Sequence, residues 1–336
     1  MTKTVPREII DFFSSRSRFY LIGHEEPDGD CITSQLALAR FLRRRGKEVD
    51  LFSPGPFIRP EILPYKDSFS RKIPASKGSE ADPAAIILDC STIDRIGGEL
   101  AADISALETL VIDHHSSGSK FGDLRYIDSA APSVTFLIWK VIIAMNCNPD
   151  RQEAELLLFG LCTDTGFFRH LEAGSTEVFL AVAALTAAGA SPLECYRLIY
   201  GGRSLESRIL TGRVLSRAEA FLGGRIIVTY ETLADKNELG KESRDSDSIY
   251  SRLQGVKSCH GVVFIREESE GEYSVGLRSG HSLDVGAVAE SFGGGGHRRA
   301  AGFTWQGSRE QIKKRLLEIF ARNLPQQPAV FPERKN

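Results

Sequence analysis

Residues 20–46 read YLIGHEEPDGDCITSQLALARFLRRRG. The apolar start is typical of a buried strand, and Pro27 and Gly29 mark a tight turn after it. The apolar spacing that follows predicts a helix over residues 31–45. A further apolar run at 49–52 closes a strand–helix–strand unit, and such units imply parallel strands joined by a right-handed crossover. The stretch therefore predicts an α/β fold.

Acidic and imidazole side chains follow one apolar run after another. The chain carries them in the order His24, Asp28, Asp30, Asp89, Asp113, His114, His115 and Asp164. We count the run 156–162, which precedes Asp164, with the strand ends, although residues 153–160 also have helical spacing. Ligands of open α/β sheets bind outside the carboxyl ends of the strands, so these side chains are expected at a single place.

Each of these motifs also has a simpler interpretation. The Asp-rich turn could cap the following helix, Asp113 with its two histidines could be a structural pair, and Asp89 and Asp164 could be ordinary caps. Their joint occurrence in one domain favours a metal cluster. Two close carboxylates raise each other's pKa unless a cation lies between them. Oxygen and imidazole donors suit Mn²⁺, Mg²⁺, Fe or Zn²⁺, and the excess of carboxylates favours Mn²⁺ or Mg²⁺.

Four carboxylates and two imidazoles are enough donors for two divalent ions. Paired ions about 3.5–4 Å apart clamp the attacking and leaving oxygens of an in-line displacement at phosphorus. Metal coordination also lowers the pKa of water, which makes a bridging hydroxide the expected nucleophile. The cluster therefore predicts hydrolysis of phosphoric esters.

A second motif lies far downstream, in the stretch Gly293-Gly294-Gly295-Gly296-His297. Successive glycines leave the backbone N–H groups open to a phosphate, and the basic residues that follow suit an anion. A flexible surface turn is the alternative. Arg278 and Ser279 form a second candidate phosphate contact, although a plain surface arginine is the better interpretation of Arg278 by itself.

Bulk properties limit the class of protein. A length of 336 residues favours two domains, and the formal net charge of −2 argues against a globally basic nucleic-acid surface. We find neither an apolar run of the ~18–20 residues that span a bilayer nor a signal-peptide core. The six scattered cysteines indicate reduced thiols in a cytoplasmic protein, and neither a disulfide framework nor a zinc site.

The change in pattern near residue 190 predicts four segments. These are a first domain at 1–190, a helical linker at 191–212, a smaller second domain at 213–324 and a flexible tail at 325–336; the family resemblance given below implies that the first is catalytic and the second binds substrate. The charged stretch 235–248 is expected to be exposed and mobile.

The motifs together resemble a known family. The set His24-x-x-x-Asp28-Gly29-Asp30, Leu88-Asp89, Asp113-His114-His115 and Thr163-Asp164-Thr165-Gly166 resembles the four motifs of the DHH phosphoesterase superfamily. The glycine run with Ala300-Ala301-Gly302 resembles the DHHA1 signature. Order and spacing are similar to the oligoribonuclease (nanoRNase)/pAp phosphatase subgroup and to stand-alone cyclic-dinucleotide phosphodiesterases, over about residues 15–305. Ser116 and Pro132-Ser133-Val134 depart from the usual pattern and leave the substrate less defined.

The resemblance implies a parallel-sheet DHH domain with helices on both faces, followed by a smaller α/β DHHA1 domain across a cleft. It implies His24, Asp28 and Asp89 as ligands of one Mn²⁺. A second Mn²⁺ would take Asp30, Asp89, His114 and Asp164, with Asp89 bridging. Asp113 would orient an imidazole, and His115 would lie close to the scissile phosphate. Arg278, Ser279 and the loop Gly293, Gly294, Gly295, Gly296 and His297 would hold the substrate's terminal phosphate or base.

The favoured hypothesis is a Mn²⁺-dependent enzyme that hydrolyses short single-stranded RNA, linear dinucleotides such as pApA, or pAp, with Mg²⁺ or another divalent ion as an alternative. Cleavage of cyclic di-AMP is left open, as is a homodimer. Long-strand exonuclease and pyrophosphatase activities are weaker alternatives. A non-catalytic nucleotide-binding module would predict loss of a metal ligand, and none of the expected ligands is missing from the sequence.

Overall fold

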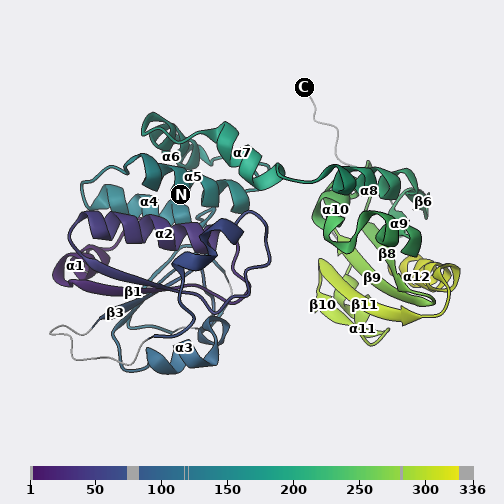
Figure 1. Ribbon diagram of the computed structural model, residues 1–336, viewed down its shortest axis with the longest axis horizontal. Coiled ribbons are helices and arrows are strands. Elements are labelled where there is room, and N and C mark those ends of the chain that lie inside the picture. The colour runs from purple at the N-terminus through teal and green to yellow at the C-terminus, as the bar shows by residue number, and fades with distance from the viewer. Residues whose placement is uncertain (1–2, 74–82, 117, 120, 281–282, 325–336) are drawn as a thin grey trace. The chain divides into compact units, whose positions relative to one another are not determined.

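The computed structural model describes residues 3–73, 83–116, 118–119, 121–280 and 283–324. The chain divides into two compact units, Met1–Gly202 and Arg203–Asn336, which are described separately (Figure 1). The segment 191–212 contains all of α7 (Pro192–Tyr200) and the first part of α8 (Leu205–Ser216). The tail at 325–336 lies outside the described residues.

The first unit is built on a five-stranded parallel sheet. Its strands are β1 (Arg18–Ile22), β2 (Glu48–Phe52), β3 (Ala84–Leu88), β4 (Thr109–Asp113) and β5 (Leu124–Ile127). They lie in the order β2-β1-β3-β4-β5, and every neighbouring pair is parallel. The prediction of a parallel sheet is confirmed. Because all five strands run the same way, their carboxyl ends meet at one edge.

Helices cover both faces of this sheet, as predicted. Alternate strand residues point to opposite faces. Phe19 and Leu21 belong to the core under the larger helical layer, whereas Tyr20 and Ile22 belong to the core under α3 (Figure 1). The helices of the unit are α1 (Arg7–Ser15), α2 (Gly29–Arg44), α3 (Gly98–Asp103), α4 (Val134–Ala144), α5 (Arg151–Asp164), α6 (Thr176–Ala187) and α7, with 3₁₀ turns at Leu63–Ser68 and Ile93–Ile96.

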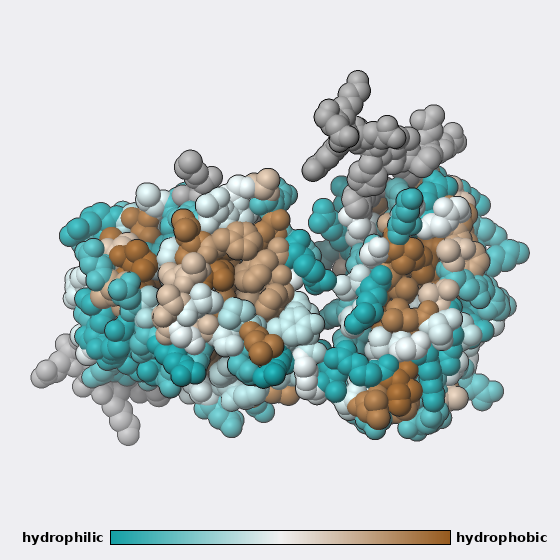
Figure 2. All heavy atoms as spheres, turned by 90° about the horizontal axis from the view of Figure 1, so that it is seen from above, coloured by the Kyte–Doolittle hydropathy of each residue, from teal (hydrophilic) through white to brown (hydrophobic). Residues whose placement is uncertain are grey.

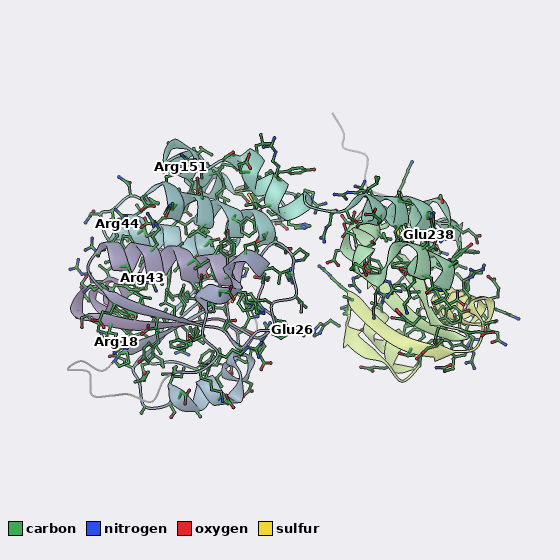
Figure 3. The ribbon with its side chains drawn as sticks, in the orientation of Figure 1. Arg18, Glu26, Arg43, Arg44, Arg151 and Glu238 are labelled. Carbon is green, nitrogen blue, oxygen red and sulfur yellow. The ribbon has the colours of Figure 1, made fainter. Side chains whose placement is uncertain are left out.

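Two glycines let α2 and α5 approach closely. A Cβ atom on Gly29 would collide with the side chain of Thr163, and one on Gly160 would collide with Thr135 and Thr33. At the far end of the pair, the guanidinium of Arg44, labelled in Figure 3, donates to both carboxylate oxygens of the fully buried Glu153, at 3.0 and 2.9 Å. The two helices are therefore held side by side along their length.

The interpretation of residues 156–162 as a strand end is wrong. These residues lie inside α5, and Asp164 is the last residue of that helix. An Asp150–Glu153 capping box starts the helix, and Leu157, Leu158 and Leu161 are buried at helical spacing. The strand that follows β4 is β5 instead, so Asp164 reaches the sheet edge from the helical layer.

The second unit has a six-stranded mixed sheet in the order β10-β11-β9-β8-β7-β6. Its strands are β6 (Glu219–Phe221), β7 (Ile226–Glu231), β8 (Gly261–Ser269), β9 (Glu272–Ser279), β10 (Gly295–His297) and β11 (Ala300–Gln306). Only β7 and β8 are parallel neighbours among these. The helices are α8, α9 (Leu233–Leu239), α10 (Ser246–Gln254), α11 (Val285–Glu290) and α12 (Arg309–Asn323), with a 3₁₀ turn at Lys241–Ser243. This smaller α/β unit is also as predicted.

The prediction that residues 235–248 form an exposed, mobile segment is wrong. The segment contains parts of α9 and α10, and Asp235 within it is 2% exposed. Arg213 and Arg217 pair with the Asp235 carboxylate, and Arg244 pairs with Glu231. Asp235 and Arg244 thus belong to ion pairs with a buried carboxylate, which composition by itself could not show.

Helices α6 and α7 carry several exposed apolar side chains. Phe179, Leu180, Leu193, Tyr196 and Leu198 are each more than half exposed. Figure 2 looks onto the side of the first unit where these helices lie and shows apolar atoms gathered there. Among the described residues no single helix has the length and apolar character to cross a membrane, although the bent pair α6 and α7 meets those criteria jointly.

Candidate active site

The turn after β1 aims one carboxylate inward and uses another as a helix cap. Asp28 is the N-cap of α2, and its Oδ1 accepts the backbone N–H of Cys31 at 3.1 Å. Asp28 is half-buried, whereas Asp30 is fully buried in the first turn of the helix. His24, which precedes the turn, is 5% exposed. The short Pro27–Gly29 turn thus places all three predicted residues at the sheet edge.

Asp30 is oriented by the start of α4. Its Oδ1 accepts the Thr135 backbone N–H at 2.9 Å and the Thr135 hydroxyl at 2.6 Å, and its Oδ2 accepts the Val134 N–H at 2.5 Å. Burial raises the pKa of Asp30 well above its usual range, and the nearby Asp164 and Asp89 raise it further. Three hydrogen bonds hold this carboxylate in place, but its negative charge needs a compensating cation.

Asp89 lies at the centre of the cluster. It follows β3 with a φ of 58°, a left-handed conformation that is uncommon outside glycine, and is 2% exposed. Its Oδ2 lies 3.5 Å from His24 Nε2, and its Oδ1 lies 3.5 Å from His114 Nε2. Oδ1 is buried and has no hydrogen-bond partner. A buried carboxylate oxygen of this kind is costly unless something positive meets it.

Backbone carbonyls set the tautomers of two histidines. His24 Nδ1 lies 2.7 Å from the Glu25 carbonyl, and His114 Nδ1 lies 3.3 Å from the Ala131 carbonyl. Because a carbonyl only accepts, each Nδ1 carries a proton, and each Nε2 is the ring atom left for a metal ion. Arg95 Nη2 also lies 3.2 Å from His24 Nδ1, which is further than the Glu25 carbonyl. Both Nε2 atoms face Asp89.

Asp164 and Asp113 complete the arrangement. Asp164 Oδ2 lies 3.2 Å from His114 Nε2, so the end of α5 closes the cluster from the helical layer. Asp113 Oδ1 lies 2.7 Å from His115 Nδ1 and also accepts the backbone N–H groups of His114 and His115. Asp113 therefore orients the His115 ring, whose Nε2 is left for another partner.

Without metal ions, the histidines of the cluster hold protons at positions that cations could occupy. Although burial opposes it, hydrogen bonds with Asp164 and Asp89 raise the pKa of His114 to about 11. Burial likewise opposes ionisation of Asp89, yet the imidazoles of His114 and His24 hold the pKa of Asp89 below its usual range. The ionised central carboxylate needs positive charge nearby, and without metal ions the protonated imidazoles provide it. Divalent cations supply that charge, so the donor set fits the metal ions expected from the sequence.

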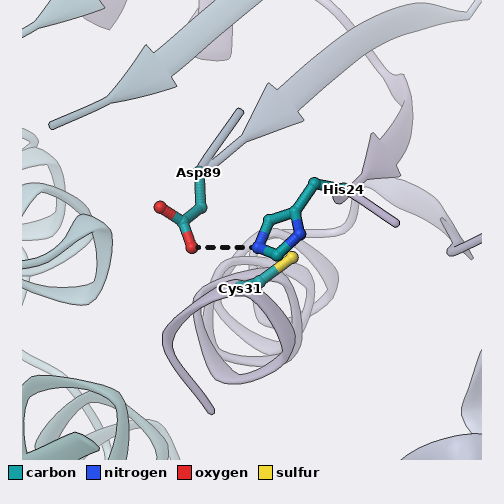
Figure 4. A group of neighbouring side chains, drawn as sticks. All are labelled: His24, Cys31 and Asp89. Atoms are coloured by element: carbon teal, nitrogen blue, oxygen red, sulfur yellow. Dashed lines mark ion pairs between the residues drawn. The ribbon is translucent and has the colours of Figure 1, made fainter. Parts of the chain in front are cut away.

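Three groups of side chains in the described residues have ligand atoms within 4.8 Å of one another. They are His24, Cys31 and Asp89; Asp89, His114 and His115; and Asp30, His114 and Asp164. Asp89 is shared by the first two groups and His114 by the last two. Asp28 belongs to none of the three groups, and Cys31 enters one (Figure 4). Sequence reasoning missed Cys31, whose only signal was its place one residue after Asp30.

The predicted residues of the second unit come together only in part. A groove of about 550 Å³ is lined by Arg278, Gly295 and Gly296, together with Ser246, Tyr250, Arg266, Ser274, Val275, Gly276, Ala300, Ala301, Gly302, Phe303 and Thr304. Neither Ser279 nor His297 lines it, and Ser279 is 3% exposed. The Arg278 guanidinium lies 4.4 Å from the Tyr250 ring centroid. The groove thus offers two arginines and an aromatic ring, of which the sequence indicated only Arg278.

The glycine run is part of a hairpin, not a free loop. Gly293 and Gly294 end the turn after α11, and Gly295–His297 forms β10, which pairs with β11. A Cβ atom on Gly294 or Gly296 would collide with the β11 backbone. His297, Arg298 and Arg299 are exposed at the hairpin tip. At least part of the glycine requirement is therefore close strand packing.

A carboxylate and imidazole cluster at the carboxyl edge of a parallel sheet is suited to metal-dependent hydrolysis. Residues 18–161 match the DHH family, N-terminal domain, and residues 223–323 match the DHHA1 domain. The chain belongs to the DHH phosphoesterase superfamily, with a DHHA1 domain after the DHH domain, and is a hydrolase of phosphoric esters.

Relatives over almost the whole chain agree with this assignment. The chain is 28% identical over 309 residues to the bifunctional oligoribonuclease and PAP phosphatase NrnA of Thermus thermophilus, covering 91% of this chain and 90% of that protein. It is 25% identical to the Bacillus subtilis protein of the same name, covering 89% and 93%. Its fold is similar to the crystal structure of an exopolyphosphatase-related protein from Bacteroides fragilis, with a TM-score of 0.76, 24% identity and coverage of 96% and 99%.

Proposed function

We propose that this chain is a two-metal phosphodiesterase and phosphatase that hydrolyses very short oligonucleotides, linear dinucleotides such as pApA, and pAp. The observation that carries the proposal is Asp89. Its carboxylate is buried between His24 and His114, 3.5 Å from each ring, and one of its oxygens has no hydrogen-bond partner. A carboxylate in that position is suited to bridge two cations.

We assign the metal ligands as the family resemblance implies. His24, Asp28 and Asp89 would hold one ion, and Asp30, Asp89, His114 and Asp164 the other. Most of these donors are carboxylate oxygens, which supports Mn²⁺, with Mg²⁺ as the alternative. When bound, two such ions supply Lewis-acid stabilisation of the phosphoryl oxygens and lower the pKa of the attacking water.

His115 and Asp113 are proposed to act beside the ions. Asp113 accepts the His115 Nδ1–H at 2.7 Å, so His115 Nε2 can donate to a phosphate oxygen or to the leaving group. The interaction with Asp113 also raises the pKa of His115. A protonated ring near the phosphate would stabilise the negative charge that develops during hydrolysis.

The groove of the second unit is proposed to take part in nucleotide binding. Arg278 and Arg266 offer guanidinium groups for a phosphate, and the Tyr250 hydroxyl is buried without a hydrogen-bond partner. Arginine is suited to phosphate because its planar fork donates two hydrogen bonds at once. The activities in the names of the Thermus thermophilus and Bacillus subtilis relatives support short nucleotides as the substrate class.

The test is a comparison of turnover on pApA, an RNA pentamer, pAp and cyclic di-AMP, each with Mn²⁺ or Mg²⁺ added to metal-free protein. We expect hydrolysis of the first three that depends on the divalent ion and is absent in Asp89→Asn. Failure to hydrolyse any of them with either ion would contradict the proposal. Fastest turnover of cyclic di-AMP would overturn the substrate ranking and leave the two-metal chemistry standing.

A homodimer is a separate part of the proposal. The exposed apolar side chains of α6 and α7 support self-association, because contiguous apolar surface is often an interaction site. Sedimentation equilibrium at micromolar concentration should give twice the mass of one chain. The mass of a single chain under those conditions would contradict it.

A further inference from the structure

One of the three donor groups contains a sulfur atom. Cys31 lies in the first turn of α2 and is fully buried. Its Sγ, a His24 ring nitrogen and an Asp89 carboxylate oxygen lie within 4.8 Å of one another (Figure 4). The Asp89 oxygen on this side is Oδ2, 3.5 Å from His24 Nε2, and all three side chains are buried. Cys31 therefore faces one of the two proposed metal positions.

The surroundings of Cys31 fix the sulfur in that orientation. Gln35, one helical turn further and fully buried, places its Nε2 3.2 Å from the Cys31 carbonyl and 3.8 Å from Cys31 Sγ. Gly23 leaves the space that both side chains occupy, because a Cβ atom there would collide with Cys31 Sγ and Gln35 Nε2. An amide donor beside a sulfur stabilises its thiolate form and orients it as a ligand.

The neighbouring Asp28, proposed above as a ligand of the same ion, also caps the helix through its Oδ1. Asp28 accepts the Cys31 backbone N–H at 3.1 Å and so caps α2. That bond fixes the start of the helix and, with it, the direction in which Cys31 points. The position next to His24 is thus formed by nitrogen, sulfur and oxygen, whereas the position at Asp30, His114 and Asp164 has only nitrogen and oxygen.

We propose that Cys31 is a thiolate ligand that makes the two metal positions unequal. The position of His24, Cys31 and Asp89 prefers a thiophilic ion such as Zn²⁺, Co²⁺ or Fe²⁺, and the position of Asp30, His114 and Asp164 keeps a harder ion such as Mn²⁺. Thiolates favour softer metals and carboxylates favour harder ones. On binding, the S–H bond breaks, a metal–sulfur bond forms and the proton passes to solvent. This inference rests on the metal centre of the proposed function.

Cobalt provides a direct optical test on the full chain. Titration of metal-free protein with Co²⁺ should produce a near-ultraviolet sulfur-to-cobalt charge-transfer band. Cys31→Ser should lose that band, while Cys259→Ser, a control at a partly buried cysteine of the second unit, should keep it. A band of full strength in Cys31→Ser would overturn the proposal.

Competition between ions tests the preference itself. Wild-type protein dialysed against equal Zn²⁺ and Mn²⁺ should retain zinc at one position per chain. Cys31→Ser should shift the zinc-to-manganese ratio towards manganese by roughly tenfold or more, since even residues that only orient a ligand change metal affinity by that factor. An unchanged ratio would overturn the proposal.

X-ray absorption at the zinc edge of the wild-type protein needs no variant, so it decides the matter even if Cys31→Ser does not fold. We expect one sulfur scatterer in the coordination shell of zinc. A wild-type protein that binds two ions and hydrolyses pApA, but shows no sulfur ligand, would overturn this inference and leave the proposed function intact. Failure to bind any divalent ion would overturn both.

Discussion

The carboxylate and imidazole cluster of the first unit is buried, whereas the groove of the second unit is open. In the cluster, Asp30 and Asp89 are almost fully buried, and hydrogen bonds from the start of α4 fix the direction of the Asp30 carboxylate. In the groove, arginine, tyrosine and serine side chains surround open space. Buried carboxylates that need cations are suited to catalysis, whereas accessible hydrogen-bond donors are suited to substrate binding. The difference predicts that variants of the cluster reduce the rate and that variants of the groove weaken substrate binding.

The largest effect is expected from the carboxylate that both metal positions share. Asp89→Asn keeps the shape of the side chain and removes its charge, so neither ion would be bridged. We predict a loss of roughly 10⁴-fold in kcat or more, comparable with removal of a central catalytic group. Initial-rate measurements on pApA would check it. Retention of more than a tenth of the activity would contradict the assignment of Asp89.

A large effect on stability, without a direct effect on the chemistry, is expected in the second unit. Asp235 is 2% exposed and pairs with Arg213 and Arg217. Asp235→Asn removes the carboxylate charge that Arg217 faces, while Arg213 keeps Glu238, so we predict a loss of about 3 kcal/mol in the free energy of unfolding. Glu238→Gln is the control, because the exposed Glu238 pairs with the same Arg213 and should contribute little.

The stability that Asp235 contributes should also depend on pH. Although burial opposes it, hydrogen bonds from Arg217 and Thr232 hold the pKa of Asp235 below its usual range. A lowered folded-state pKa gives stability that is present above the unfolded pKa of about 3.9 and is lost as pH falls further. The free energy of unfolding should therefore decrease more between pH 7 and about pH 2.5 in wild type than in Asp235→Asn. Equal decreases would contradict this role.

The sequence indicated the cluster better than the groove, and the reason is physical. Parallel strands bring their carboxyl ends to one edge, so His24, Asp89 and His114 could be placed together from three separate motifs. Arg266 reaches the groove only through the antiparallel register that sets it opposite Ser274, and Tyr250 reaches it from α10. Long-range strand register leaves no local motif that marks those residues.

Two local features of the cluster could also not be predicted from the sequence. Apolar residues 156–162 fit a buried strand or a buried helix, and packing of α5 against α2 decides for the helix. Cys31 looked like an ordinary core cysteine, because its direction depends on where the cap at Asp28 starts the helix. A shift of one residue would have turned the sulfur away from His24.

A smaller loss of rate is expected where the cluster meets the substrate. Asp113→Asn weakens the bond that orients His115 and removes the charge that favours its protonated form. We predict roughly a 100-fold decrease in kcat with little change in KM, which is the usual size of a general-acid contribution. Asp123→Asn, an exposed aspartate that bonds Thr109, is the control and should be neutral. A change in KM alone would contradict the role of Asp113.

The smallest effect is expected in the groove. Arg278→Gln removes one guanidinium from its lining, so we predict roughly a tenfold increase in the Kd for pAp and in KM, with kcat nearly unchanged. Arg252→Gln, on an exposed position of α10 outside the lining, serves as the matched control. Calorimetric titration with pAp would measure both. A fall in kcat with unchanged binding would contradict the assignment of catalysis to the cluster and of substrate binding to the groove.

Electron paramagnetic resonance of the protein loaded with Mn²⁺ alone tests the central claim most directly, because it reports whether two ions share a bridge. The arrangement around Asp89 predicts an exchange-coupled pair of Mn²⁺ ions in wild type, which Asp89→Asn should abolish. The hyperfine pattern of isolated Mn²⁺ at full loading of the wild-type protein, or binding of a single ion per chain, would contradict a two-metal centre.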